Sequence, residues 1–180
     1  MKDILVFDNE TTGLTLHPQA DVRKQPKMIE FGGVLLSRTD GSIIEEFSIL
    51  IDPREPLEAI ITKITGLTDA DLAGAPTFTE ALPQLRRIFE SCDAVIAHNL
   101  PFDKAIVLGE LARNSITEFP WPGRELCTVG LYKEQWGRNP KMLELYEVVI
   151  GKPLGQTHRA LDDALALVEI VRKEELWRLI

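Results

Sequence analysis

Residues 4–13 read Ile4-Leu5-Val6-Phe7-Asp8-Asn9-Glu10-Thr11-Thr12-Gly13. The apolar run that ends in a carboxylate predicts a buried β-strand, which we expect over residues 2–8. Because side chains alternate along a strand, Asp8 and Glu10 should point to the same face. Two adjacent carboxylates repel each other, which favours a site where a cation or a shared proton compensates. A pair of solvated acids at a strand end is the alternative, and it stays open at this point.

The remainder of the chain carries strand and helix patterns in one continuous order. Strands are expected at residues 29–37, 43–51, 93–97 and 125–129, with a hairpin turn at Asp40-Gly41 and a polar loop at 15–27. Helices are expected at residues 57–64, 79–91, 99–114, 130–137, 141–150 and 158–179. The sequence shows no repeat or linker, so we predict a single α/β domain over residues 1–180, with a mixed sheet covered by helices.

Composition narrows the classes of function. The 180 residues include 20 Lys and Arg against 28 Asp and Glu, a net charge of −8. This balance argues against a nucleic-acid coating protein, but not against an enzyme that holds nucleic acid through metal ions. The sequence has no apolar run near the ~20 residues that span a bilayer and no secretory signal pattern, so we expect a cytoplasmic protein without membrane contact. Cys92 and Cys127 match no metal-binding spacing and are expected to be buried thiols.

Three motifs follow one another along the chain. They are Phe7-Asp8-Asn9-Glu10-Thr11-Thr12-Gly13-Leu14, then Ala97-His98-Asn99-Leu100-Pro101-Phe102-Asp103, then His158-Arg159-Ala160-Leu161-Asp162-Asp163-Ala164. Together they resemble the DEDDh 3′→5′ exonucleases, a family that includes the epsilon-type proofreading subunits of bacterial replicative polymerases and RNase T-like enzymes. The segments Ile29-Glu30-Phe31-Gly32 and Ile64-Thr65-Gly66-Leu67-Thr68 add support. The resemblance implies a ribonuclease-H-like α/β fold: a mixed five-stranded sheet with helices on both faces.

The resemblance also implies a metal site. It makes Asp8, Glu10, Asp103 and Asp163 the ligands of two divalent cations, and it makes His158 the general base. Carboxylate oxygens are the ligands that Mg²⁺ or Mn²⁺ prefers, and paired ions of this kind suit the hydrolysis of a phosphodiester. A histidine with an ordinary pKa of about 6.5 can accept the proton of an attacking water near neutral pH.

Helical periodicity separates the two neighbouring acids of the third motif. Asp163 lies near the edge of the apolar stripe of its helix, whereas Asp162 lies in the middle of the polar face and should be solvated. His158 is five residues before Asp163, which is not one helix face, so we expect it on the loop or first turn. His98 is the rival base, but its place between a strand and a helix suits a hydrogen-bonding role. Asn9 should point away from the metals.

Further residues are expected to bind the substrate. By resemblance, Thr11 and Thr12 contact the 3′ end and Leu14 wedges against the last base; turn formation and packing are the alternative roles. The second motif adds His98, Asn99 and Phe102 to the predicted substrate-binding set. A basic and aromatic stretch between Tyr132 and Arg159 either guides a single strand or forms a solvated face.

The resemblance thus predicts a two-metal 3′→5′ exonuclease. It would release 5′-mononucleotides from a single-stranded or frayed nucleic-acid 3′ end, with DNA the expected polymer. An RNA-trimming 3′→5′ exoribonuclease of the same family and a non-catalytic nucleic-acid-binding module are the alternatives. The sequence ends soon after the third motif, so we expect no polymerase-docking tail and a stand-alone or accessory enzyme.

Overall fold

The computed structural model describes residues 2–17, 19–155 and 157–180. The expected loop at 15–27 includes residue 18, which lies outside the described residues. The strands are β1 (Asp3–Thr11), β2 (Met28–Leu36), β3 (Ile43–Leu50), β4 (Cys92–Ala97) and β5 (Arg124–Cys127). The α-helices are α1 (Ala59–Thr65), α2 (Asp69–Leu72), α3 (Phe78–Ser91), α4 (Leu100–Arg113), α5 (Thr128–Trp136), α6 (Met142–Ile150) and α7 (Ala160–Lys173). Short 3₁₀ helices occupy η1 (Val22–Lys24) and η2 (Leu176–Leu179).

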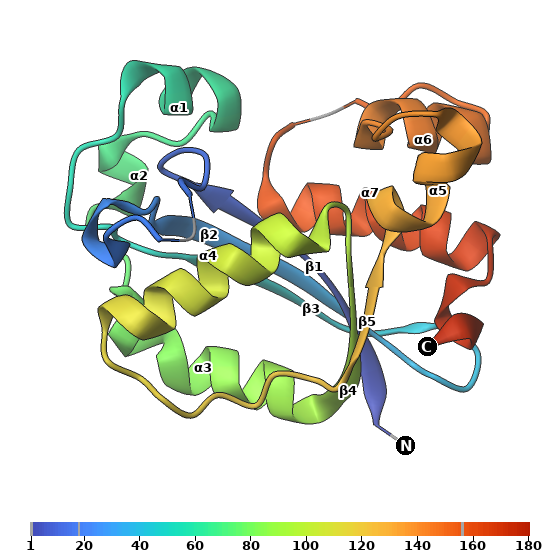
Figure 1. The fold of residues 1–180 in the computed structure, drawn as a ribbon, viewed down its shortest axis with the longest axis horizontal. Helices are drawn as coiled ribbons and strands as arrows, with labels where there is room; N and C mark the ends of the chain where they lie inside the picture. The colour runs from blue at the N-terminus through green and yellow to red at the C-terminus, as the bar shows by residue number, and fades with distance from the viewer. Residues whose placement is uncertain (1, 18, 156) are drawn as a thin grey trace.

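The strands form one five-stranded sheet in the order β3-β2-β1-β4-β5 (Figure 1). The meander β1-β2-β3 is antiparallel, whereas β4 and β5 run parallel to β1. The mixed five-stranded sheet is therefore confirmed. The central position of β1 brings the end of that strand between β2 on one side and the connection from β4 to α4 on the other.

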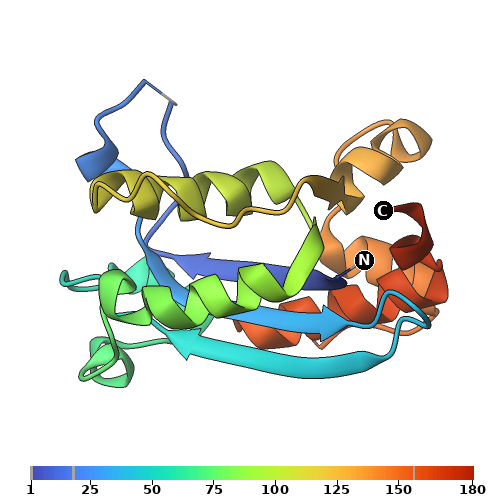
Figure 2. The same cartoon turned by 90° about the horizontal axis from the view of Figure 1, so that it is seen from below.

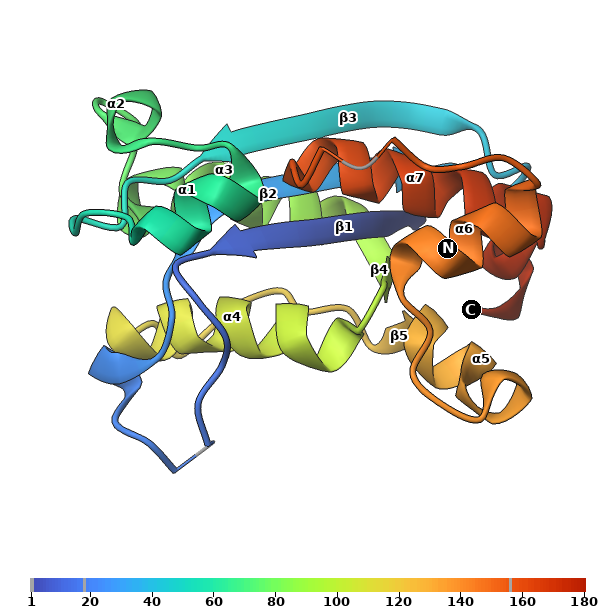
Figure 3. The same ribbon diagram turned by 90° about the horizontal axis from the view of Figure 1, so that it is seen from above.

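Helices cover both faces of the sheet, as predicted. Leu5 and Phe7 of β1 pack with apolar residues of α3 and α4, and Ile4 and Val6 pack with those of α6 and α7. Figures 2 and 3 show α3 and α4 on one side of the sheet and α7 on the other. The alternation of side chains along β1 thus sends even-numbered positions toward α7 and odd-numbered ones toward α4.

Several element ends differ from the sequence prediction. The strand expected at 125–129 ends at Cys127, because Thr128 is buried and begins α5 with its hydroxyl bonded to His98. The helix expected at 158–179 covers only Ala160–Lys173: Glu175 has a left-handed φ of 52°, which ends the helix and turns Trp177 back onto Gly41. The short helix α2, with a capping box, was not predicted.

The remaining expectations are mostly met. The hairpin turn falls at Asp40-Gly41, and Gly66 ends α1 in a left-handed conformation. Of the two thiols, Cys92 is buried as expected, but the expectation was wrong for Cys127, which is half-buried and caps α5 by accepting a hydrogen bond. Within the described residues, no helix has the length and apolar composition needed to cross a membrane.

Candidate active site

The first two carboxylates lie at the end of β1. Asp8 pairs across the sheet with Gly32 of β2, and Glu10 pairs with Glu30. Both side chains lie on the even-numbered face of β1, the face that packs against α7, and both are half-buried. The prediction that Asp8 and Glu10 share a face is confirmed by this register.

The start of α7 lies directly on β2 at this point. A Cβ atom on Gly32 would lie 2.1 Å from the backbone of Ala160 and of Leu161, so only a glycine permits this approach. The approach brings Asp163, which is 8% exposed, to the end of β1. Asp163, Glu10 and His158 each offer a ligand atom, and the three atoms all lie within 4.8 Å of one another.

Asp103 reaches the site from the other face of the sheet. It lies in the first turn of α4, is 2% exposed, and has a charge that acts on Asp8. Its carboxylate and its backbone carbonyl both accept a hydrogen bond from the Asn9 amide, at 3.2 and 3.4 Å. The expectation for Asn9 was therefore incomplete. Its side chain points away from Asp8 and Glu10, but it contacts Asp103, because α4 packs on the odd-numbered face of β1.

The neighbouring acids perturb one another. Burial raises the pKa of Asp8 well above its usual range, and the charge of Asp103 adds to the effect. Burial also raises the pKa of Glu10 to about 8, with the charge of Asp163 as the next cause, and burial raises the pKa of Asp103 to about 8. Acids with such values are costly to ionise together, and a bound cation offsets that cost. The all-oxygen set of carboxylates fits a hard divalent ion.

The two acids of the third motif behave as the periodicity predicted. Asp163 is buried at the site and Asp162 is exposed. The Asp162 carboxylate nevertheless accepts a hydrogen bond from the Thr157 hydroxyl at 2.6 Å. His158 lies outside α7, as expected for a residue of the loop, and has a left-handed φ of 51°.

His98 is held inside the protein by both ring nitrogens. Nε2 lies 3.1 Å from the carbonyl oxygen of Pro140, and Nδ1 lies 2.9 Å from the Thr128 hydroxyl. Since a carbonyl only accepts, Nε2 carries the proton and Nδ1 accepts from the hydroxyl. Burial lowers the pKa of His98, which favours this neutral form. The arrangement matches the expected hydrogen-bonding role and leaves His158 as the base candidate.

The predicted substrate residues lie at different depths. Thr11 is buried, and its hydroxyl donates to the carbonyl of Gly13 at 2.7 Å, which is the turn-forming role. Leu14 is 83% exposed and borders a hollow of about 440 Å³ between the turn and residues 23–26 and 55–58. Asn99 is exposed with a left-handed φ of 71°, and Phe102 packs partly against the core.

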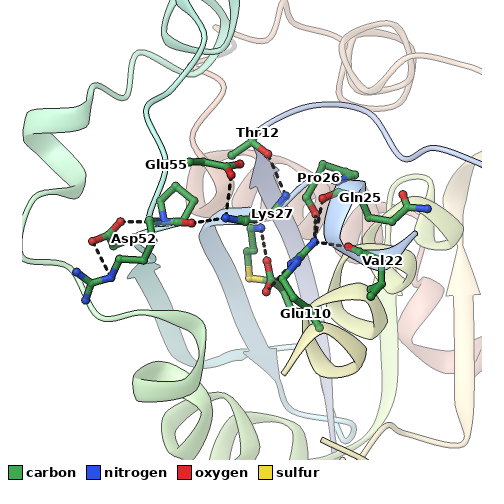
Figure 4. Close-up of polar contacts among 12 residues, drawn as sticks. Thr12, Val22, Gln25, Pro26, Lys27, Asp52, Glu55 and Glu110 are labelled. Atoms are coloured by element: carbon green, nitrogen blue, oxygen red, sulfur yellow. Dashed lines mark hydrogen bonds and ion pairs between the residues drawn. The ribbon is translucent and has the colours of Figure 1, made fainter. Parts of the chain in front are cut away.

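The loop that follows Leu14 is anchored where it returns to the sheet (Figure 4). The Thr12 hydroxyl accepts from the backbone N–H of Lys27 at 3.0 Å, and the Lys27 ammonium lies 2.8 Å from the Glu55 carboxylate. Arg113, paired with the buried Glu110, donates to three backbone carbonyls between residues 22 and 26. Thr12 therefore has a structural hydrogen bond, as its alternative role required.

The basic and aromatic stretch is largely paired. Arg138 makes two hydrogen bonds to Glu144, and Lys152 lies 3.2 Å from Glu169. Arg159 is bound to Glu30. The pairs of Arg138 and Lys152 favour the interpretation of a solvated face for those two residues, whereas Arg159 is directed at a buried carboxylate.

Glu30 was missed as a site residue by the sequence reasoning, which used it only as support for the resemblance. The available signal was an acid within a strand that is otherwise apolar or glycine; every residue of β2 is buried. Burying a lone carboxylate is costly, so its presence there indicated a charged partner.

The fold and the carboxylate cluster together define an α/β nuclease-like protein, and comparison with known proteins identifies the family. The RNase T family model, described as an exonuclease, matches residues 5–171. The chain therefore belongs to this exonuclease family. It is 33% identical over 178 residues to the DNA polymerase III epsilon subunit of Aquifex aeolicus, covering 96% of this chain and 81% of that protein.

Other relatives are much longer. The DNA polymerase III PolC-type protein of Clostridium perfringens is 32% identical over 177 residues, which cover 94% of this chain but 11% of the relative.

Solved structures of similar length share the fold. The nuclease domain of 3′hExo, a DEDDh family member bound to rAMP, has a TM-score of 0.78 at 17% identity, covering 97% of this chain and 92% of that one. Exonuclease X in complex with 5′ overhanging duplex DNA has a TM-score of 0.66 at 24% identity, covering 96% and 93%. These two likenesses confirm the fold class.

Proposed function

We propose that the chain is a metal-dependent 3′→5′ exonuclease that hydrolyses the terminal phosphodiester of a nucleic acid and releases 5′-mononucleotides. The observation that carries the proposal is the convergence of carboxylates from β1, α4 and α7 on one place, with His158 beside two of them. Membership in the exonuclease family supports the same chemistry.

The residues present fit a pair of divalent cations. Asp8, Glu10, Asp103 and Asp163 would hold Mg²⁺ or Mn²⁺, since these acids are crowded and their oxygens are hard ligands. When bound, such ions would supply electrostatic stabilisation of the charge that develops on the phosphate and the leaving oxygen. The acids would therefore serve as ligands, and the raised pKa values of Asp8, Glu10 and Asp103 mean that protons compete with the cations.

His158 is the proposed general base. Its ring lies close enough to Glu10 and Asp163 to face a nucleophile in the site. A neutral imidazole there would accept the proton of the attacking water, since His158 precedes α7 and one of its ring nitrogens lies within 4.8 Å of carboxylate oxygens of Glu10 and Asp163. Leu14, which is exposed beside a hollow, would contact the last base of the substrate.

DNA is the proposed polymer. The relatives of the chain at 32–33% identity bear the names of DNA polymerase III proteins, which supports DNA. The RNA-trimming alternative has support from a structural neighbour, a 3′-exonuclease described in 3′-end specific recognition of a histone mRNA stem-loop. The chain spans about a tenth of the length of the PolC-type relatives.

The proposal is tested by digestion of matched DNA and RNA oligonucleotides labelled at the 5′ end, with Mg²⁺, Mn²⁺ or a chelator. Stepwise shortening from the 3′ end that requires a metal, and that is lost in Asp163→Asn, is expected. Glu118→Gln is the control, because that carboxylate is exposed and is not one of the acids of the site. Full activity in chelator would refute the metal role, and tight binding without cleavage in Mn²⁺ would favour the binding module.

A further inference from the structure

Glu30 is a buried carboxylate that accepts hydrogen bonds from Arg159 and Ala160, at the start of α7, and from Ser48 of the neighbouring strand β3. It is 1% exposed. Arg159 donates to both of its oxygens, from Nε to Oε2 at 3.0 Å and from Nη2 to Oε1 at 2.8 Å. The backbone N–H of Ala160 donates to Oε2 at 3.1 Å, and the Ser48 hydroxyl donates to Oε1 at 3.3 Å. A two-pronged arginine pair of this kind fixes geometry as well as charge.

Two of the residues that Glu30 binds, Arg159 and Ala160, come directly after His158. The backbone of His158 is left-handed, with φ of 51°, a conformation that costs free energy for a residue other than glycine and persists only where neighbours hold it. On the other side of His158, the Thr157 hydroxyl donates to the Asp162 carboxylate at 2.6 Å. Both flanks of His158 are therefore fixed by side-chain hydrogen bonds.

The close approach at Gly32 makes β2 the support of this segment. The missing Cβ of Gly32 lets the Ala160 backbone lie against the strand two residues from Glu30. Glu30 is also the cross-strand partner of Glu10. Strand β2, which pairs with β1 beside the acids, thus also contacts Arg159 and Ala160, the two residues that follow His158.

We propose that Glu30, acting through Arg159 and Ala160, is a positioning residue that sets the backbone of His158 and aims its ring at the reacting water. The inference rests on the proposed exonuclease function. Asp162 supports the other flank through Thr157. Glu30 contacts none of the reacting atoms.

A charge effect and a positioning effect make different predictions for the two partners. The charge of Glu30 raises the pKa of Glu10 and the charge of Arg159 lowers it. If the pair acted through its charges on Glu10, Glu30→Gln and Arg159→Gln would change metal affinity in opposite directions. If the pair positions His158, both substitutions lower kcat and leave the metal affinity similar.

The experiment measures kcat, KM and the Mn²⁺-induced shift in Tm for Glu30→Gln, Arg159→Gln and the double variant. Asp93→Asn is the control, because Asp93 forms an ion pair with Arg38 at the opposite end of the same sheet. We expect kcat to fall by about 10- to 100-fold in both single variants, with KM and the Mn²⁺ shift retained. The double variant should be no slower than the slower single variant, since the two residues act as one unit.

Several outcomes would overturn the inference. A kcat of Glu30→Gln equal to that of Asp93→Asn, or opposite changes in the two single variants, excludes positioning while leaving the exonuclease function intact. A wild-type protein that does not cleave any oligonucleotide removes the proposed function and this inference with it. If Glu30→Gln does not fold, the kcat values of Arg159→Gln and Thr157→Val are compared with that of Asp93→Asn instead, because the side chains of Arg159 and Thr157 lie nearer the surface. A kcat equal to that of Asp93→Asn in both variants would again exclude positioning.

Discussion

Glu10→Gln should stabilise the metal-free protein at alkaline pH while abolishing the activity. Burial and the neighbouring acids raise the pKa of Glu10 from 4.5 to about 8. A group whose pKa is raised in the folded state contributes stability below its unfolded pKa, and this contribution is lost as the pH rises through the folded value. The native protein should therefore lose stability between about pH 4.5 and pH 8, and a neutral glutamine should avoid the loss.

The magnitude follows from the same values. The difference between 4.5 and about 8, at about 1.36 kcal/mol for each pKa unit, sets a ceiling of about 5 kcal/mol. Asp8, Asp103 and Asp163 share the repulsion, and glutamine keeps the shape but remains a buried polar group. We therefore expect about 2–3 kcal/mol at pH 9. For a chain of this size, that corresponds to a rise in Tm of roughly 4–12 °C.

The assay is thermal unfolding of wild type and Glu10→Gln in chelator at pH 5 and pH 9, followed by circular dichroism. The two proteins should have similar Tm values at pH 5, where the Glu10 carboxyl is protonated in the folded protein, and should separate at pH 9. Glu118→Gln, which removes an exposed charge, is the control. An unchanged or lower Tm of Glu10→Gln at pH 9 would refute the account of the site as a crowded set of acids.

Three more substitutions test other parts of the site. His158→Ala should lower kcat by about 10²–10⁴-fold, the range for a general base, while the Mn²⁺-induced shift in Tm remains that of the wild type. A normal kcat would show that His158 is not the general base. Asn9→Leu removes the hydrogen bond to Asp103 and should weaken Mn²⁺ affinity about tenfold or more in a metal titration of activity. Gly32→Ala forces a methyl group against the Ala160 backbone and should cost about 1–3 kcal/mol in denaturant unfolding, together with most of the activity.

The parts of the site that sequence predicted are those with a local signal. The alternation of β1 placed Asp8 and Glu10 on one face, and the helical stripe separated Asp163 from Asp162; both follow from the backbone period. The roles of the five predicted catalytic residues rested on the resemblance and stay proposals. The order of strands and helices was also predictable, because the spacing of apolar residues along the sequence differs between strands and helices.

The features that sequence missed depend on contacts between distant residues. Thr128 begins a helix rather than continuing β5, since its hydroxyl meets His98, thirty positions earlier in the chain. The last helix ends early because Trp177 packs on Gly41, a position on the hairpin between β2 and β3. Helical periodicity continues across such points, because the apolar residues beyond them are also buried.

The same long-range packing explains how one end of β1 holds so many acids. Burying Asp8, Glu10, Asp103 and Asp163 opposes folding, and burial raises the pKa of the first three of these acids. Two extensive apolar layers, one on each face of the sheet, offset it, and the backbone of α7 lies directly against Gly32 of β2. The acids are therefore held together by the rest of the protein before any cation binds. A cation then gains the free energy that the repulsion had cost, which is why removing one acid should stabilise the empty site and weaken the loaded one.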